Sequence, residues 1–339
     1  MGYITLNKKH FFHNLDAISQ QTNAKEKIAI VLKDNAYGHG LIEMATLSQE
    51  YGVAHAVVRT GAEASTIASN FKTILVLADI HTQPTHKHIH IAINDIADLS
   101  LLKEDTAIEL KFDTGMHRHG LTIENIQDAF AIIHTKKLRL KGVFTHHRSA
   151  DVLSSEYFWQ EEQFSYIKQQ IEEALKKYNM PPLRYHSQNS AATFRTNTPH
   201  DIVRVGVAAY WLLTMPQALL QADLKPVLSL WAQRLHSFES QKHFKHGYEG
   251  KGLIKEDSTL STYDIGYADG LLRLPDDQAY LSASGDKFIG RVSMDNVIIQ
   301  SDKDKLCLFH DANDYAKTAQ TISYEVVVRL APSLPRSII

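Results

Sequence analysis

The sequence predicts an α/β protein in which an N-terminal (β/α)8, TIM-like barrel precedes a smaller, mostly β domain. Two observations support this prediction. Short apolar segments typical of strands alternate with helical segments up to about residue 225, and beyond that point helical segments become rare. The length of 339 residues also suits one large domain or two smaller ones.

Eight segments before residue 225 have the apolar, β-branched character of buried strands. They cover residues 28–33, 54–58, 72–79, 90–94, 107–112, 142–146, 184–187 and 203–208. A closed barrel of parallel strands accounts for eight such segments, although a doubly wound open sheet would show the same alternation.

Helical segments separate several of these strands. Residues 41–51, 123–138 and 156–178 carry apolar side chains at helical spacing. Thr122 is placed to cap the second of these helices with its hydroxyl.

The alternation of strands and helices stops after residue 225, where strand-like segments are separated by polar turns. These segments cover residues 227–235, 261–266, 288–300 and 305–309, followed by a short helix near residues 315–329. We therefore expect a barrel over residues 1–225 and a β-domain over residues 226–339.

The composition argues against several classes of partner. The chain has 36 lysines and arginines against 38 aspartates and glutamates, a formal net charge of −2, which does not suit a strongly basic nucleic-acid binder. Cys307 is the only cysteine, so neither an intramolecular disulfide nor a cysteine zinc cluster can form. No segment approaches the roughly 18 apolar residues of a membrane span. We expect a cytoplasmic protein without nucleic-acid or membrane partners.

Lys33 is the first residue that suggests chemistry. It ends the first strand candidate, where a barrel places its catalytic groups, and a Gly-containing turn follows it. A partly desolvated lysine at such a place can form a Schiff base with a carbonyl compound or a pyridoxal cofactor. A surface lysine with its amine in solvent fits the segment equally well.

The fifth strand candidate carries charges on one face. Glu109, Lys111 and Asp113 alternate, so they would point together into the barrel and need partners, of which Arg118 is a natural one. This pattern fits either an active site or a structural ion-pair network.

Four histidines lie close together in the segment before and within the fourth strand candidate. They are His81, His86, His88 and His90. A metal site needs more ordered ligands and supporting acids than this segment offers, so we expect a solvated strand edge and no metal.

Seven motifs, in order along nearly the whole chain, give the sequence a specific resemblance. They are VLKDNAYGHG at 31–40, KFDTGMHRHG at 111–120, FTHHRSAD at 144–151, HSQNSAATFR at 186–195, VRVGVAAYW at 203–211, DIGYADGLLR at 264–273 and GRVSMDNV at 290–297. In these motifs and their order the chain resembles the alanine racemases, enzymes that hold pyridoxal 5′-phosphate (PLP) on a lysine.

The resemblance implies that PLP is bound to Lys33 and held by a defined set of residues. The set is Tyr37, His146, Asn189, Ser190, Arg204, Gly206 and Val207. Arg204 would face the pyridine nitrogen and disfavour its protonation, which narrows the chemistry to exchange of the α-proton. His146 is expected only to support the ring and its arginine.

The resemblance also assigns the substrate and the second acid/base group. Arg118 and the backbone amide of Met294 would bind the substrate carboxylate, while Lys111, which often carries a carbamate in similar racemases, and Asp295 would support them. Racemisation needs an acid/base on each face of the substrate. Lys33 would serve one face and Tyr267 the other, donated by the partner subunit of a head-to-tail homodimer.

The implied reaction is the interconversion of L-alanine and D-alanine, which supplies D-alanine for peptidoglycan. Three alternatives remain at this point: a broad-specificity amino-acid racemase, a PLP-dependent decarboxylase and a non-catalytic PLP carrier. The pairing of Lys33 with Tyr267 disfavours the decarboxylase, and the β-domain with Tyr267 disfavours the carrier.

One position departs from the family pattern. A second active-site tyrosine usually follows the first by eight residues, and an ungapped comparison anchored on Tyr324 places Pro332 there. We expect this proline to make the pocket more tolerant of side chains larger than methyl.

Overall fold

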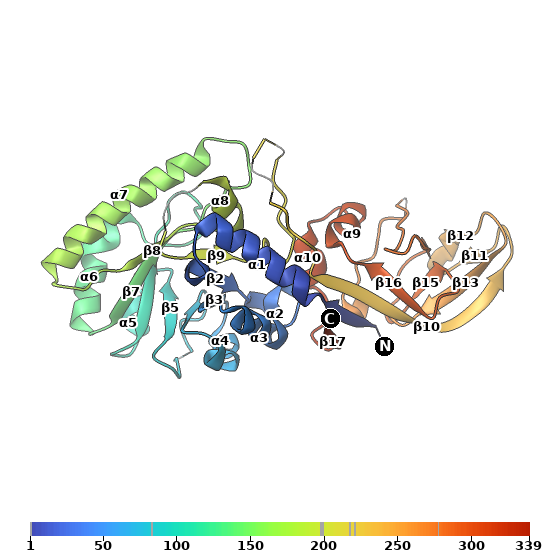
Figure 1. Ribbon diagram of the computed structural model, residues 1–339, viewed down its shortest axis with the longest axis horizontal. Coiled ribbons are helices and arrows are strands. Elements are labelled where there is room, and N and C mark those ends of the chain that lie inside the picture. The colour runs from blue at the N-terminus through green and yellow to red at the C-terminus, as the bar shows by residue number, and fades with distance from the viewer. Residues whose placement is uncertain (1, 83, 197–199, 217, 220–221, 277) are drawn as a thin grey trace.

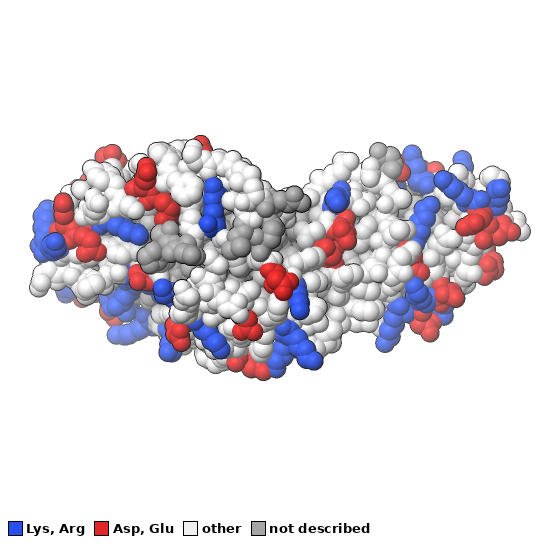
Figure 2. All heavy atoms as spheres, turned by 45° about the horizontal axis from the view of Figure 1, so that its top comes forward, with Lys and Arg blue, Asp and Glu red and all other residues white. Residues whose placement is uncertain are grey.

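The computed structural model describes residues 2–82, 84–196, 200–216, 218–219, 222–276 and 278–339. It has two domains that lie side by side along the long axis of the molecule, with the barrel at one end and the β-rich domain at the other (Figure 1). The face drawn in Figure 2 carries cationic and anionic side chains in alternation, without a broad area of one sign. Within the described residues, every helix is too short or too polar to span a lipid bilayer.

The first domain is built on eight parallel strands in the order β8-β7-β6-β5-β4-β3-β2-β9. Their bounds are β2 Ile28–Val31, β3 His55–Val58, β4 Thr73–Val76, β5 Ile89–Ile93, β6 Ala107–Lys111, β7 Arg139–Phe144, β8 Arg184–His186 and β9 Val203–Val205. The last strand pairs with the first, and the Arg204 N–H donates to the Gln188 carbonyl at 3.0 Å where β9 approaches the end of β8. The predicted barrel is confirmed, and the open-sheet alternative is wrong.

Helices surround this sheet, as the alternating pattern predicts. They are α1 Lys8–Thr22, α2 Lys33–Tyr37, α3 Leu41–Tyr51, α4 Gly61–Thr66, α5 Asp98–Leu101, α6 Ile126–Thr135, α7 Glu156–Lys177 and α8 Ser190–Arg195, with 3-10 turns η1 Lys25–Lys27, η2 Ala68–Asn70 and η3 Ile123–Asn125. Thr122 is the N-cap residue of the turn that leads into α6, as expected, and the Asn125 side-chain oxygen accepts hydrogen bonds from its N–H at 2.9 Å and its hydroxyl at 3.2 Å.

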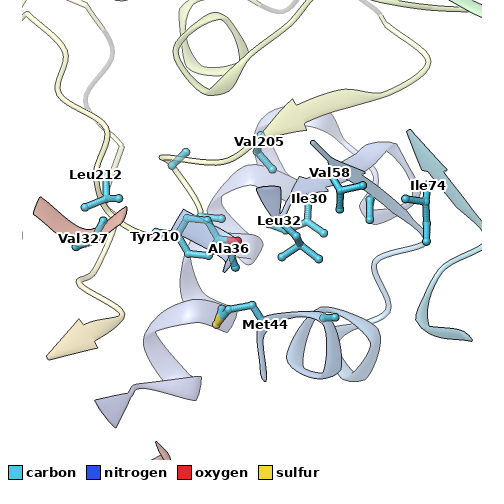
Figure 3. Close-up of a cluster of buried hydrophobic side chains, with 14 of the residues drawn as sticks. Ile30, Leu32, Ala36, Met44, Val58, Ile74, Val205, Tyr210, Leu212 and Val327 are labelled. Atoms are coloured by element: carbon cyan, nitrogen blue, oxygen red, sulfur yellow. The ribbon is translucent and has the colours of Figure 1, made fainter. Parts of the chain in front are cut away.

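Apolar side chains from both domains meet under the barrel mouth. Figure 3 shows Ile30, Leu32 and Tyr210 in one apolar cluster, in which Val327 of α10 (Ser323–Val328), from the second domain, lies on the side of Tyr210. All four are buried, and burial of one aliphatic side chain of this size contributes about 1.5–3 kcal/mol. This packing fixes the second domain against the segment that carries Lys33.

The second domain contains a seven-stranded sheet in the order β14-β15-β13-β10-β1-β17, with β16 also paired to β10. Its elements are β1 Tyr3–Leu6, β10 Leu228–Ser240, β13 Ser258–Tyr263, η5 Tyr267–Asp269, β14 Lys287–Ile289, β15 Val297–Gln300, β16 Lys305–Phe309, α9 Ala312–Thr318, α10 and β17 Arg336–Ile338, with a small hairpin of β11 Lys245–His246, η4 Tyr248–Gly250 and β12 Gly252–Leu253. A division at residue 225 assigns β1 to the barrel, but β1 pairs with β10 and β17 in this sheet.

Several predicted elements differ from the structure. Strand β2 ends at Val31 and β7 at Phe144, so Lys33 and His146 do not end their strands but follow them by two residues. The single helix predicted near residues 315–329 is two helices, because Gln320 adopts a left-handed conformation with φ 56° and breaks the chain between them. Helix α1 is absent from the sequence prediction.

Candidate active site

A cavity of about 540 Å³ lies at the carboxyl ends of the barrel strands. The residues that the resemblance places in the barrel all line it: Lys33, Tyr37, Lys111, Arg118, His146, Asn189, Ser190, Arg204, Gly206 and Val207. Tyr324 of α10 also lines it, whereas Pro332 does not. Its charged side chains are mostly cationic, which suits a phosphate and a carboxylate as ligands.

The turn after Lys33 has an unusual backbone. The four residues Asp34, Asn35, Ala36 and Tyr37 have φ values of 55°, 57°, 51° and 53°, which is the left-handed region that L-residues normally avoid. Such strain persists only where surrounding contacts determine the conformation. Here Glu63 accepts a hydrogen bond from the Asp34 N–H at 2.7 Å.

Two further contacts hold this left-handed turn. The Asp34 carboxylate forms an ion pair with Arg59 at 3.0 Å. The Asn35 side-chain oxygen accepts a hydrogen bond from the Leu41 N–H at 2.8 Å, so the turn is tied to the start of α3. These contacts orient Lys33 and Tyr37 toward the cavity.

Gly38 closes the turn against the second domain. It has φ 80°, and a Cβ at this position would lie 1.8 Å from the carbonyl oxygen of Val327. Arg336 of β17 donates a hydrogen bond to the Gly38 carbonyl at 2.9 Å. The position of the lysine turn therefore depends on both domains.

The far side of the cavity offers hydrogen-bond donors for an anion. The Ser190 hydroxyl oxygen accepts hydrogen bonds from the N–H groups of Gly206 at 3.0 Å and Ala208 at 3.2 Å, so the hydroxyl hydrogen is left to donate to a ligand. A Cβ on Gly206 would lie 2.8 Å from the Tyr37 hydroxyl, so only glycine leaves that hydroxyl in place. Asn189 caps α8 by accepting a hydrogen bond from the Ala192 N–H at 3.0 Å. This donor set fits the phosphate of PLP.

Arg204 is buried at the floor of the cavity and its orientation is fixed by hydrogen bonds. It donates to Nδ1 of His186 at 2.5 Å, to the Thr145 carbonyl at 2.6 Å and to the Ser187 carbonyl at 3.1 Å. Burial lowers the pKa of Arg204 only to about 10, so the guanidinium is charged at neutral pH. The same burial and the charge of Arg204 hold the pKa of His146 well below its ordinary value, so His146 is neutral.

Glu109 lies beneath these residues, with 0% of its surface exposed. Its carboxylate meets His186 Nε2 at 2.7 Å, His90 Nδ1 at 2.8 Å and the Arg184 guanidinium. Burial alone would raise the pKa of Glu109, but Arg184 and the histidine hydrogen bonds hold it well below its ordinary value.

These contacts correct two expectations. Glu109 pairs with Arg184 of β8 and not with Arg118, because strands distant in sequence converge in the barrel interior. His90 is not part of a solvated strand edge but is buried beside Glu109.

Lys111 is 5% exposed and lies above Glu109 on the same strand. Its amine donates a hydrogen bond of 2.8 Å to Nδ1 of His119. Burial, together with the charges of Arg118 and Arg204, lowers the pKa of Lys111 to about 7. Asp113, which the alternating pattern groups with Lys111, instead accepts hydrogen bonds from backbone N–H groups of its own loop.

Tyr267 and Met294 lie on the second domain and do not line this cavity. They are neighbours, because the Ala268 N–H donates to the Met294 carbonyl at 3.0 Å. Their side chains are exposed to 45% and 52%, and Asp295 lies in the same exposed loop. The structure therefore separates these three residues from the barrel site of their own chain.

His186 and His119 have no role in the sequence analysis, although both stand in quoted motifs. The position of His186 in a strand at the barrel interior could have identified it. The contact of His119 with Lys111 could not have been predicted, because it depends on how the loop after β6 folds back.

Comparisons with known proteins cover nearly the whole chain. The family model of the alanine racemase N-terminal domain matches residues 6–214, and that of the alanine racemase C-terminal domain matches residues 227–338. The alanine racemase of a Nitratiruptor species is 43% identical over 337 residues, 99% of each chain. The alanine racemase of Campylobacter concisus is 39% identical over 340 residues, the full length of both.

Solved structures agree with the fold. The alanine racemase of Clostridium difficile 630 has a TM-score of 0.86 at 24% identity and covers 100% of this chain and 95% of its own. The Bacillus anthracis alanine racemase with bound L-Ala-P has a TM-score of 0.83 at 24% identity, with the same coverage.

Proposed function

The chain belongs to the alanine racemase family, and from this premise we propose that it interconverts L-alanine and D-alanine with PLP held on Lys33. The observation that carries the proposal is the cavity in which Lys33, the anion-binding donors around Ser190 and the buried Arg204 come together. The alternatives of a decarboxylase and a carrier lack support from these comparisons.

The residues present fit PLP. When bound, PLP withdraws electrons from an amino acid and acidifies its α-hydrogen. Ser190, the Val207 backbone amide and Tyr37 would hold the phosphate, while Gly206, whose N–H donates to the Ser190 hydroxyl oxygen, would position that hydroxyl. Arg204 would donate to the pyridine nitrogen. A guanidinium keeps its protons at neutral pH, so Arg204 leaves that nitrogen unprotonated.

Lys33 serves as the acid/base on one face of the substrate. Arg118 lines the same cavity. It would bind the substrate carboxylate. Lys111 would orient Arg118, and a carbamate on Lys111 would give Arg118 an anionic partner in a cavity rich in cations.

The opposite face needs a second acid/base, which we assign to Tyr267 of a partner subunit. Tyr267 and Met294 are exposed neighbours outside the cavity of their own chain, as residues that complete a partner's site would be. The proposal therefore includes a head-to-tail homodimer in which residues 1–225 bind PLP and residues 226–339 complete the other subunit's site, with Asp295 supporting the substrate loop. Its D-alanine would serve peptidoglycan synthesis in the cytoplasm.

The test is incubation of the purified, PLP-loaded protein with L-alanine in D2O, with chirality and α-deuterium measured together. D-alanine carrying α-deuterium is the expected product. Tyr267→Phe should lose racemisation and keep bound PLP, whereas Tyr248→Phe, another exposed tyrosine of the same domain, should match the wild type. Absence of exchange in the loaded wild type would overturn the proposal.

A further inference from the structure

The loop after β6 folds back so that His119 lies beside Lys111. The Leu121 N–H donates to the Lys111 carbonyl at 2.8 Å, and the Asp113 N–H donates to the Leu121 carbonyl at 3.0 Å. Gly120, with φ 136°, allows this close return, because a Cβ there would lie 2.7 Å from the Asp113 nitrogen. The result is the 2.8 Å hydrogen bond between Lys111 Nζ and His119 Nδ1.

The surroundings of the Lys111 amine are short of negative charge. Arg118, Arg204 and Lys33 all act on it as cations. Asp113 is the acid that acts on it, and its carboxylate already accepts hydrogen bonds from the N–H groups of Gly115 and His117 at 2.9 and 3.0 Å. Among the described residues, no carboxylate forms an ion pair with Lys111. An anion at this point would be stabilised by its neighbours.

At neutral pH the Lys111 amine can give up a proton and the His119 imidazole can accept one. Burial and the neighbouring cations lower the pKa of Lys111 to about 7, so a large share of the amines is neutral. Partial burial of its ring and the charges of Lys111 and Arg118 lower the pKa of His119, so its ring is neutral and can accept a proton. His146, the other histidine near Lys111, is buried deeper among the same cations and is a poorer acceptor.

We propose that His119 is the base that promotes carbamylation of Lys111 by CO2. A bond forms between Lys111 Nζ and the carbon of CO2, one C=O bond pair moves to oxygen to give the carbamate anion, and the proton leaves Nζ for His119 Nδ1. The products are a carbamate beside Arg118 and an imidazolium that can release its proton to solvent, since His119 is exposed at the cavity mouth. In racemisation His119 is a positioning residue, and this part rests on the proposed function.

The test is 13C NMR of the PLP-loaded protein with 13C-labelled bicarbonate, which detects the carbamate without any measurement of racemisation. Lys111→Ala identifies the resonance by removing it. His119→Leu removes the base, and His119→Asn keeps an acceptor atom near Nδ1 but cannot take up the proton. We expect the rate of carbamate formation at pH 7 to fall at least tenfold in both variants.

The outcomes separate this inference from the proposed function. A wild-type carbamylation rate in His119→Leu, or a loss that His119→Asn restores fully, would overturn the role of His119 as a base. A wild-type protein that racemises alanine without a carbamate resonance would overturn the inference and leave the proposed function intact. A His119-dependent carbamate in a protein that does not racemise alanine would support the inference and overturn the proposed function.

Discussion

Arg204 donates a 2.5 Å hydrogen bond to Nδ1 of His186 at the floor of the barrel cavity. Because a guanidinium has no lone pair to offer, Nδ1 must be the acceptor, and the hydrogen of the neutral ring is on Nε2. Nε2 faces the Glu109 carboxylate at 2.7 Å. Glu109 therefore fixes the tautomer of His186, and through it the orientation of Arg204.

The first prediction concerns this arrangement. Glu109→Gln should lower the free energy of unfolding by about 3–5 kcal/mol, because it removes a fully buried carboxylate that is the counter-charge of the partly buried Arg184 guanidinium. The loss should be visible in urea denaturation. Glu104→Gln, which removes an exposed ion pair with Lys137, should change stability by less than about 1 kcal/mol. Equal effects of the two substitutions would contradict a structural role for the buried carboxylate.

A second prediction concerns the contact between the lysine turn and the second domain. Gly38→Ala places a methyl group 1.8 Å from the Val327 carbonyl and should destabilise the protein by about 3 kcal/mol or more while weakening PLP binding. Gly52→Ala is the matched control, since Gly52 also has a positive φ of 100° but open space around its Cβ position. It should cost only about 1 kcal/mol of backbone strain. If Gly38→Ala and Gly52→Ala lower the free energy of unfolding by similar amounts in urea denaturation, the contact between Gly38 and Val327 does not contribute to stability beyond backbone strain.

Local patterns predict much of the barrel. The alternation along residues 107–112 predicts that Glu109 and Lys111 face the interior, and their burial confirms it. The partners of Glu109 could not be predicted in the same way. Arg184 and His186 come from a strand more than 70 residues away, and only the closed barrel brings them to the carboxylate.

The lysine turn shows a different limit of sequence reasoning. Four successive residues without glycine adopt a left-handed conformation, against their local preference. The contacts that impose this conformation come from Glu63, Arg59 and the domain formed by the end of the chain. The sequence therefore predicts that Lys33 lines the cavity, as it does, whereas the backbone conformation that presents Lys33 could not be predicted.

A third prediction follows from Pro332, which lies in the turn after α10. With a proline where similar racemases have a tyrosine, the protein should accept serine better relative to alanine than a Pro332→Tyr variant does. The Pro332 carbonyl accepts a hydrogen bond from Arg336 at 3.0 Å. Because Pro332→Tyr keeps the backbone carbonyl, the variant should retain this contact. The measurement is kcat/KM for both amino acids. The same ratio in both proteins would contradict the expected role of this position.

The last prediction is the pH dependence of stability. Burial lowers the pKa of His39 to about 4 and that of His186 to about 3, from an ordinary value of about 6.5. Between about pH 6.5 and 4 the unfolded chain therefore binds more protons than the folded protein, so the free energy of unfolding falls as the pH falls.

Each of these two histidines can contribute up to about 1.4 kcal/mol per pH unit in this window. The measurement is urea denaturation of the protein without added cofactor at pH 7.5, 6.5 and 5.5, where stability should change little in the first interval and decrease in the second. His134→Gln, a change at an exposed histidine of α6, should leave the slope unaltered. A free energy of unfolding that stays constant from pH 6.5 to 5.5 would show that these buried rings are not neutral in the folded protein, and the tautomer of His186 could then not be the one that orients Arg204.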